Sequence, residues 1–261
     1  MLRSIWHHKN LIFNMALKDL RDKYVGTAMG FIWNIVSPLT QIIIYSLVFS
    51  QLMRVKMGED LGDYAFSIYL CSGLLPWIAF NEIVIRGTQT LNENATYLKK
   101  LPIPEIVFFT KNALSSFFSA VLSLCILFIV NLVLGGEVNV SWLVLPFYIV
   151  LMLTFGYALS ILFGILNVFL RDTVQIVTIL LQVWMWLTPI VYLIDILPGN
   201  MQKLVYWNPM YYYIEPIHQV VMNGQYGTLN NFATMMAFSL LTLILSYALL
   251  KRIKSEVRDV L

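Results

Sequence analysis

Six long apolar runs constrain the fold of this chain more than any other feature of its sequence. A helix needs about 20 consecutive apolar residues to cross the roughly 30 Å hydrocarbon core of a bilayer. Charged residues make up only 12% of the chain, against roughly 25% in ordinary soluble domains. We therefore expect an all-α integral membrane protein with a single transmembrane domain over residues 1–261. Its six predicted spans are residues 29–53, 66–85, 106–134, 142–170, 173–194 and 232–250.

The distribution of Lys and Arg predicts the orientation of these spans. With the N-terminus in the cytoplasm, fourteen of the 17 Lys and Arg residues lie inside, and Arg54, Lys56 and Lys203 lie outside. Cytoplasmic segments of membrane proteins carry such an excess. An even number of spans also places both termini on one side. We expect a multi-pass protein with both termini in the cytoplasm, and the small net charge of +3 gives no indication of nucleic-acid binding.

The segment before the first span has the pattern of an amphipathic helix. In residues 10–24, apolar side chains including Leu11, Ile12 and Met15 share one helical face, and Lys18 lies elsewhere. This pattern favours a helix in the cytoplasmic membrane interface. A solvated surface helix is the alternative.

Two further segments are neither simple spans nor simple loops. The polar inner segment 87–105 predicts a short helix over 92–99, which ends before Pro102; it is either a connector or a docking site for a partner. In the outer segment 195–231, the apolar stretches 201–207 and 210–222 are too short to cross a bilayer. They predict paired short re-entrant helices, and an ordered outer loop with interfacial aromatic residues is the alternative.

Motifs for catalysis and for metal binding are absent from the sequence. It contains no H-E-x-x-H helix, no G-x-S-x-G turn and no G-x-x-x-x-G-K-[ST] loop. We predict no catalytic residue, no metal site and no cofactor bound by this chain. Glu215 and His218 are interpreted as a structural pair, and Cys71 and Cys125 as small core residues.

Polar residues and prolines inside the spans have local interpretations. Glu82 and Arg86 are four residues apart and share a helical face; they form either a local ion pair or the polar lining of a pathway. No series of buried acids recurs along the spans, which disfavours a proton-coupled carrier. Pro38, Pro76 and Pro189 are each expected to kink a span.

Several segments resemble one transporter family. They are residues 17–52 (LKDLRDKYVGTAMGFIWNIVSPLTQIIIYSLVFSQL), 69–80 (YLCSGLLPWIAF), 167–192 (NVFLRDTVQIVTILLQVWMWLTPIVY) and 207–210 (WNPM). Together they are similar to the polysaccharide-export permeases of ATP-binding-cassette transporters, which move O-antigen, capsular polysaccharide or teichoic acid. The resemblance covers almost the whole chain.

The resemblance implies a homodimer in the bacterial cytoplasmic (inner) membrane that works with two copies of a separate ATPase subunit. That ATPase binds ATP and Mg²⁺, and the substrate is a polyprenyl-diphosphate-linked glycan. The permease contacts the ATPase through the helix over 10–24 and the segment 91–104, and 195–223 corresponds to the outer re-entrant helices. The residues expected to couple to the ATPase are Leu17, Leu20, Tyr97, Leu98 and Lys99.

Two sets of side chains are candidates for contact with the substrate. Arg21 and Lys23 are placed to receive the lipid diphosphate at the inner interface; anchoring by the positive-inside effect is their alternative role. Aromatic planes can pack on the C–H faces of sugar rings, although aromatic residues at span ends are also interface anchors. The candidates for the glycan pathway are Trp77, Phe80, Trp184 and Tyr192. Trp184 and Trp186 are two residues apart, so they are expected to face different directions.

The functional prediction is export of an O-antigen by this permease. Within the same superfamily, the alternatives are export of capsule, teichoic acid, a drug or a lipid. A membrane enzyme of lipid-linked sugar metabolism is the alternative from another class, and the missing catalytic cluster argues against it.

Overall fold

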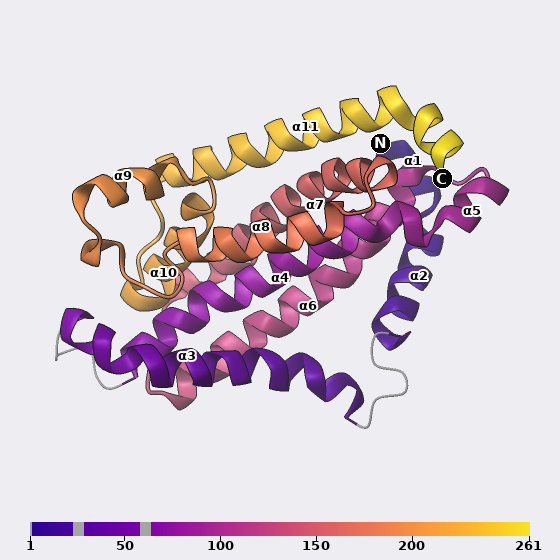
Figure 1. Ribbon diagram of the computed structural model, residues 1–261. Helices are drawn as coiled ribbons and strands as arrows, with labels where there is room; N and C mark the ends of the chain where they lie inside the picture. The colour runs from indigo at the N-terminus through magenta and orange to yellow at the C-terminus, as the bar shows by residue number, and fades with distance from the viewer. Residues whose placement is uncertain (1, 23–28, 58–63) are drawn as a thin grey trace.

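The computed structural model describes residues 2–22, 29–57 and 64–261, and these ranges contain helices and turns but no strand. The helices form an elongated bundle (Figure 1). In chain order they are α1 (Leu2–His7), α2 (Lys9–Asp22), α3 (Trp33–Met57), α4 (Ala65–Glu93), α5 (Ala95–Lys100), α6 (Glu105–Val133), α7 (Leu145–Phe169), α8 (Thr173–Leu187), α9 (Gly199–Trp207), α10 (Tyr211–Asn223) and α11 (Leu229–Val260).

Four helices of the described chain are long and apolar enough to cross a membrane. They are α4, α6, α7 with the short turn before it, and α11. The apolar parts of α3 and α8 are shorter, at Trp33–Phe49 and Thr173–Leu187. The all-helical class is confirmed, and the count of six crossings stays a prediction.

The prediction for the fifth span is wrong at its C-terminal end. Helix α8 ends at Leu187, and Thr188 adopts an extended conformation before Pro189. Proline disfavours the helical conformation of the residue before it, so Pro189 ends this helix instead of kinking it. Pro38 and Pro76, by contrast, lie inside α3 and α4 as expected.

Helix α4 forms the centre of the bundle. It packs against α3, α6, α7, α8 and α10, and most of its residues are buried. Close approach to α7 depends on small residues. A Cβ atom on Gly164 of α7 would lie 2.9 Å from the carbonyl oxygen of Gly87 in α4 and 2.7 Å from the ring of Phe109 in α6. Small residues are the usual means by which helices approach closely in membranes.

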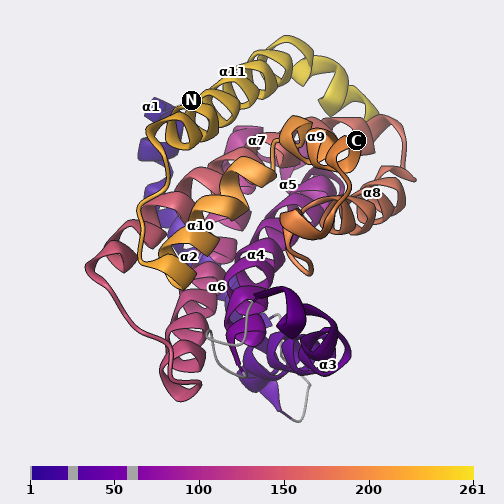
Figure 2. The same cartoon turned by 90° about the vertical axis from the view of Figure 1, so that its left-hand side faces the viewer.

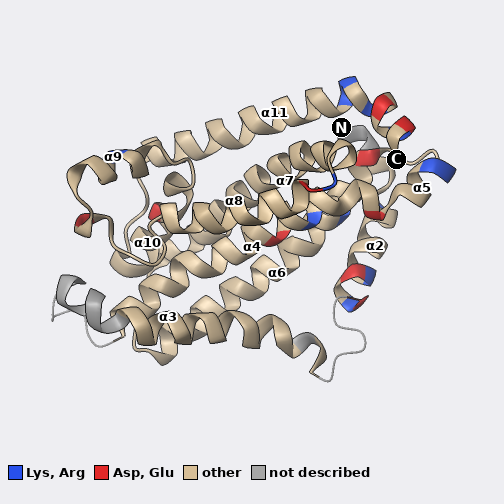
Figure 3. Ribbon diagram, in the orientation of Figure 1, with Lys and Arg blue, Asp and Glu red and all other residues tan. Residues whose placement is uncertain are grey.

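The two ends of the bundle differ in charge. Helices α1, α2, α5 and the C-terminal end of α11 gather at one end, which carries most of the Lys, Arg, Asp and Glu residues that the structure describes (Figure 3). Helices α9 and α10 lie at the opposite end (Figure 1, Figure 2). Helix α1, the first described helix, and the C-terminus both lie at the charged end (Figure 1).

Residues 195–231 contain two short helices, α9 and α10, and their re-entrant placement stays a prediction. Helix α10 packs against α4, α7 and α11, and Tyr213 and Ile217 on it are fully buried. The hydroxyl of Tyr213 donates to the carbonyl oxygen of Met235 in α11, at 2.9 Å. Helix α10 is thus part of the core of the bundle and not a surface loop.

The two cysteines lie in different environments. Both are free thiols; Cys71 is buried in α4, whereas Cys125 lies on an exposed face of α6. The interpretation of Cys125 as a core residue is therefore wrong for the single chain. Much of the apolar surface of α6 is not buried against other helices of this chain.

Candidate functional site

An ion-pair network joins α2 to the transmembrane bundle near the charged end. Oδ2 of Asp19 lies 3.1 Å from Nη2 of Arg86 in α4 and 2.9 Å from Nζ of Lys111 in α6. Nη1 of Arg86 lies 3.2 Å from Glu82 and donates to the Ser115 hydroxyl at 2.8 Å. The predicted ion pair between Glu82 and Arg86 is confirmed, and it is part of a larger network.

The network balances two acids against two bases in a mostly buried setting. The side chains of Asp19, Arg86, Glu82 and Lys111 are 9–25% exposed. A buried charge is stable only when a partner compensates it, so Asp19 compensates cations on two helices at once. The sequence did not reveal the roles of Asp19 and Lys111, because contacts between distant segments leave no local pattern.

The remaining contacts of α2 explain which of its residues face the protein. Ile12 and Ala16 are buried, and the helix packs against α6. Leu17 and Leu20 are partly buried, and Arg21 is exposed. The other candidate for diphosphate binding, Lys23, lies outside the described residues.

The predicted coupling helix α5 has one buried and two exposed candidates. Leu98 is 2% exposed, whereas Tyr97 is 51% exposed and Lys99 is also exposed. Of these three candidates, Tyr97 and Lys99 are therefore accessible to a partner and Leu98 is not. The sequence did not predict that Arg258, near the end of α11, forms an ion pair with Glu105 and donates to the carbonyl oxygen of Ile103. These contacts hold the end of the 91–104 segment against the last helix.

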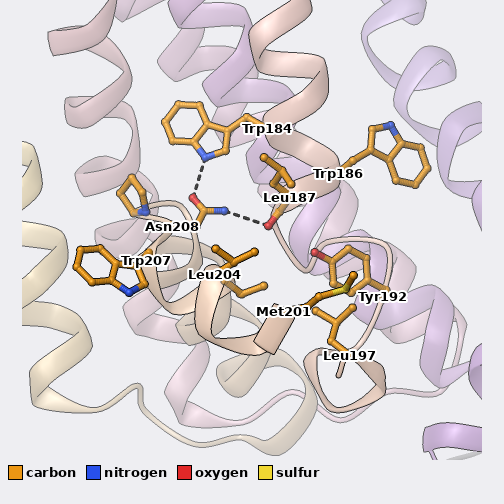
Figure 4. A pocket seen from close by; sticks show the side chains of 11 residues that line it. Trp184, Trp186, Leu187, Tyr192, Leu197, Met201, Leu204, Trp207 and Asn208 are labelled. Atoms are coloured by element: carbon orange, nitrogen blue, oxygen red, sulfur yellow. Dashed lines mark hydrogen bonds between the residues drawn. The ribbon is translucent and has the colours of Figure 1, made fainter. Parts of the chain in front are cut away.

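An aromatic groove lies at the opposite end, between α8 and α9 (Figure 4). It has a volume of about 580 Å³. Asn208 fixes its walls: Trp184 Nε1 donates to Asn208 Oδ1 at 2.7 Å, and Asn208 Nδ2 donates to the carbonyl oxygen of Leu187 and to the Thr188 hydroxyl. The groove-lining residues are Trp184, Trp186, Leu187, Tyr192, Leu197, Met201, Leu204, Val205, Trp207, Asn208 and Pro209.

The four pathway candidates fall into two pairs. Trp184 and Tyr192 line the groove, whereas Trp77 and Phe80 are buried behind Trp184, with ring centroids 6.3 and 5.9 Å from it. Trp186 points away from Trp184, as expected, yet both line the groove because it extends around the end of α8 (Figure 4). The sequence analysis did not select Trp207, which is 86% exposed.

His218 does not pair with Glu215, contrary to the sequence interpretation. Its Nε2 lies 3.2 Å from the carbonyl oxygen of Pro189. Because a carbonyl oxygen can only accept a hydrogen bond, Nε2 carries the proton. Nδ1 lies 2.7 Å from the Ser72 hydroxyl. The ring stacks on Tyr69 at 3.9 Å. Burial lowers the pKa of His218 to about 3, so the ring is neutral. Glu215 instead accepts a hydrogen bond from Gln219, and burial raises its pKa.

Known proteins resemble this chain over most of its length. An "O-antigen export system permease protein RfbA" of Myxococcus xanthus is 27% identical over 74% of this chain and 72% of its own. A protein of the same name from Klebsiella pneumoniae is 26% identical over 82% and 81%. The "Polysialic acid transport protein KpsM" of Escherichia coli is 24% identical over 90% of each chain.

The region that matches a known family includes both the ion-pair network and the aromatic groove. The sequence profile described as "ABC-2 type transporter" matches residues 11–222, from within α2 to the end of α10. In the described part of the chain, no group of three or more His, Cys, Asp or Glu residues could hold a metal ion. The matched region is well over half of the 261 residues, and this chain is therefore a member of the ABC-2 type transporter family.

Proposed function

We propose that this chain is the permease subunit of an exporter that moves a polyprenyl-diphosphate-linked O-antigen across the bacterial cytoplasmic membrane. Two permease copies form a homodimer, and two copies of a separate ATPase subunit, which bind ATP and Mg²⁺, drive it. The observation that carries the proposal is the agreement among relatives, whose names all refer to polysaccharide export or transport and which match over 72–90% of their own lengths.

The charged end of the bundle is the proposed surface for the ATPase. It exposes Tyr97 and Lys99 on α5, and α2 lies at the same end (Figure 3). Placing this end in the cytoplasm satisfies the positive-inside rule and puts both termini inside. Arg21, exposed on α2 at this end, is available there to a lipid diphosphate.

The ion-pair network offers a route from this surface into the bundle. A shift of α2 away from its position would separate Asp19 from Arg86 and Lys111 and leave two mostly buried cations without their carboxylate. Because that separation is costly, α2 and the inner parts of α4 and α6 move together. Movement of the ATPase is thereby transmitted to the helices at the centre of each permease.

The aromatic groove at the outer end is the proposed surface for the departing glycan. Trp184, Tyr192 and Trp207 line it, and sugar C–H faces pack on aromatic rings. In the homodimer, a second copy facing this groove would supply another set of the same rings. Trp77 and Phe80 support Trp184 from behind in this conformation.

Capsular polysaccharide is the second candidate substrate. The relative named for polysialic acid transport matches 90% of this chain, a larger share than the two O-antigen relatives described above. Deletion of the gene distinguishes the candidates: we expect loss of surface O-antigen with accumulation of its lipid-linked form inside the cell, and unchanged capsule. Wild-type amounts of every surface polysaccharide would overturn the proposal, as would hydrolysis of a lipid-linked sugar by the purified chain without ATP.

The ATPase surface has its own test. Replacing Lys99 with Glu is expected to lower recovery of the ATPase subunit when the tagged permease is purified, because it reverses an exposed charge on α5. Lys203→Glu on α9, at the opposite end, is the matched control and leaves recovery unchanged. Equal recovery with both variants would contradict the assignment of α5 to the ATPase surface.

A further inference from the structure

A polar crevice opens between α3, α4 and α6, away from the aromatic groove. Its volume is about 340 Å³. Each of the three helices contributes at least one polar side chain to its walls, and a tryptophan also lines it. The residues on which the argument rests are Trp33, Asn34 and Ser37 of α3, Glu82 of α4, and Ser119 and Ser123 of α6.

The crevice is unusual for a cavity among membrane helices because it contains a carboxylate and several hydroxyls. Ionisable residues at membrane depth are costly and mark functional sites. The Oγ atom of Ser119 is buried and has no hydrogen-bond partner among the described residues. Native proteins rarely leave a buried hydroxyl in this state, so the wall of the crevice has hydrogen-bonding capacity that the described protein does not use.

The chemistry of the walls selects a neutral, polyhydroxylated ligand. The volume falls at the lower end of the roughly 300–1,000 Å³ typical of small-molecule pockets and far exceeds that of a bare ion. A carboxylate accepts hydrogen bonds, while amides and hydroxyls both donate and accept, which matches the hydroxyls of a sugar. A diphosphate requires cations, and no Lys or Arg is among the described residues that line the crevice. An acyl chain would leave the buried hydroxyl of Ser119 without a hydrogen-bond partner.

We propose that this crevice binds a sugar residue of the lipid-linked glycan, close to its diphosphate. The proposal rests on the proposed function, because it takes the glycan as the transported molecule. Glu82, Ser119 and Ser123 hydrogen-bond the sugar hydroxyls, and the partly exposed ring of Trp33 packs on its C–H face. The ion pair with Arg86, at 3.2 Å, holds the carboxylate of Glu82 in a fixed position.

The test measures lipid binding to the permease–ATPase complex in nanodiscs by native mass spectrometry. The two probes are polyprenyl diphosphate carrying one N-acetylhexosamine and polyprenyl diphosphate without a sugar. The double variant Ser119→Ala, Ser123→Ala removes two hydroxyls and is expected to weaken binding of the sugar-bearing lipid about tenfold, with the bare lipid unaffected. Thr178→Val is the matched control, because it removes an exposed hydroxyl of α8 that donates only within its own helix.

A second variant fills the crevice instead of removing its polar groups. Ser119→Leu is expected to abolish the preference for the sugar-bearing lipid, and leucine is well tolerated in an apolar helix. If wild type prefers the sugar-bearing lipid and both crevice variants keep that preference, the crevice is not the sugar site, although the proposed function stands. If the wild-type complex binds neither lipid, the proposed function fails, and the crevice proposal fails with it.

Discussion

Replacing Asp19 with Asn removes the charge that joins α2 to two helices of the bundle. The substitution preserves the size of the side chain and its ability to form hydrogen bonds. Nη2 of Arg86 and Nζ of Lys111, at 3.1 and 2.9 Å from Oδ2 of Asp19, would then face a neutral amide. Apart from this network, α2 relies on an apolar face that buries Ile12 and Ala16.

The expected loss follows from the geometry of the two ion pairs. Unit charges about 3 Å apart attract by roughly 5–6 kcal/mol at an effective dielectric constant of about 20, and desolvation offsets most of this. Removing one partner of a fully buried pair costs about 3–5 kcal/mol. Because the three side chains are 9–25% exposed, we expect a loss of about 2–3 kcal/mol in the free energy of unfolding.

Unfolding of the purified permease in mixed micelles measures this loss. Asp22→Asn is the matched control, since Asp22 lies on the same helix and is exposed; its effect should stay within about 0.5 kcal/mol. Adding Lys111→Met to Asp19→Asn removes one uncompensated cation, so the double variant should lose at least about 1 kcal/mol less than the sum of the single losses. Strict additivity would refute the argument.

The same variant tests transmission from the ATPase. In the permease–ATPase complex, Asp19→Asn should reduce stimulation of ATP hydrolysis by lipid-linked glycan and leave basal hydrolysis unchanged, because the ATPase site lies in another subunit. Full stimulation in a variant that has lost stability would show that the network supports the fold but carries no signal.

Three further predictions concern packing, the groove and pH. Gly164→Ala places a Cβ atom 2.7 Å from the ring of Phe109 and should destabilise the permease by about 1–3 kcal/mol; an unchanged unfolding midpoint would contradict this. Asn208→Ala removes the hydrogen bonds that join Trp184, Leu187 and Thr188. It should speed proteolysis between α8 and α9, and a wild-type cleavage rate would count against the role of Asn208. The pKa of His218 is lowered from 6.5 to about 3, so His218 of the unfolded state is protonated at a higher pH than His218 of the folded state. The free energy of unfolding should therefore fall as the pH drops below about 6.5, by at most about 1.4 kcal/mol per pH unit. The raised pKa of Glu215 acts in the opposite sense, so the comparison is between wild type and His218→Gln at pH 7 and pH 5; equal pH dependence would refute the effect.

Hydropathy predicted the long helices because nearly every residue of a helix that lies within a membrane or a buried core must be apolar. It predicted two short apolar helices within a few residues of the bounds of α9 and α10. It failed at Pro189, where we expected a kink and the helix ends. A proline near the end of an apolar run is compatible with either outcome, and the nearby Asn208, which hydrogen-bonds the freed carbonyl of Leu187, is 21 residues away in sequence.

The candidate sites were less predictable than the fold. Glu82 and Arg86 are four residues apart, so helical spacing revealed their ion pair. Asp19 lies among other charged residues of α2, and no local pattern separates it from the exposed Asp22. The aromatic residues showed the same difficulty: Trp77 and Trp184 look alike in sequence, but only Trp184 lines the groove.

The network around Asp19 also imposes an order on the biosynthesis of the chain. Lys111 follows Asp19 by 92 residues, which at roughly 5–20 residues per second delays its synthesis by about 5–18 seconds. For most of that interval α2 is already synthesised, while α6 has yet to be made. Helix α2 therefore docks late, only after α4 and α6 are both in place. A nascent chain that fails to insert either helix leaves Asp19 of α2 without one of its cationic partners.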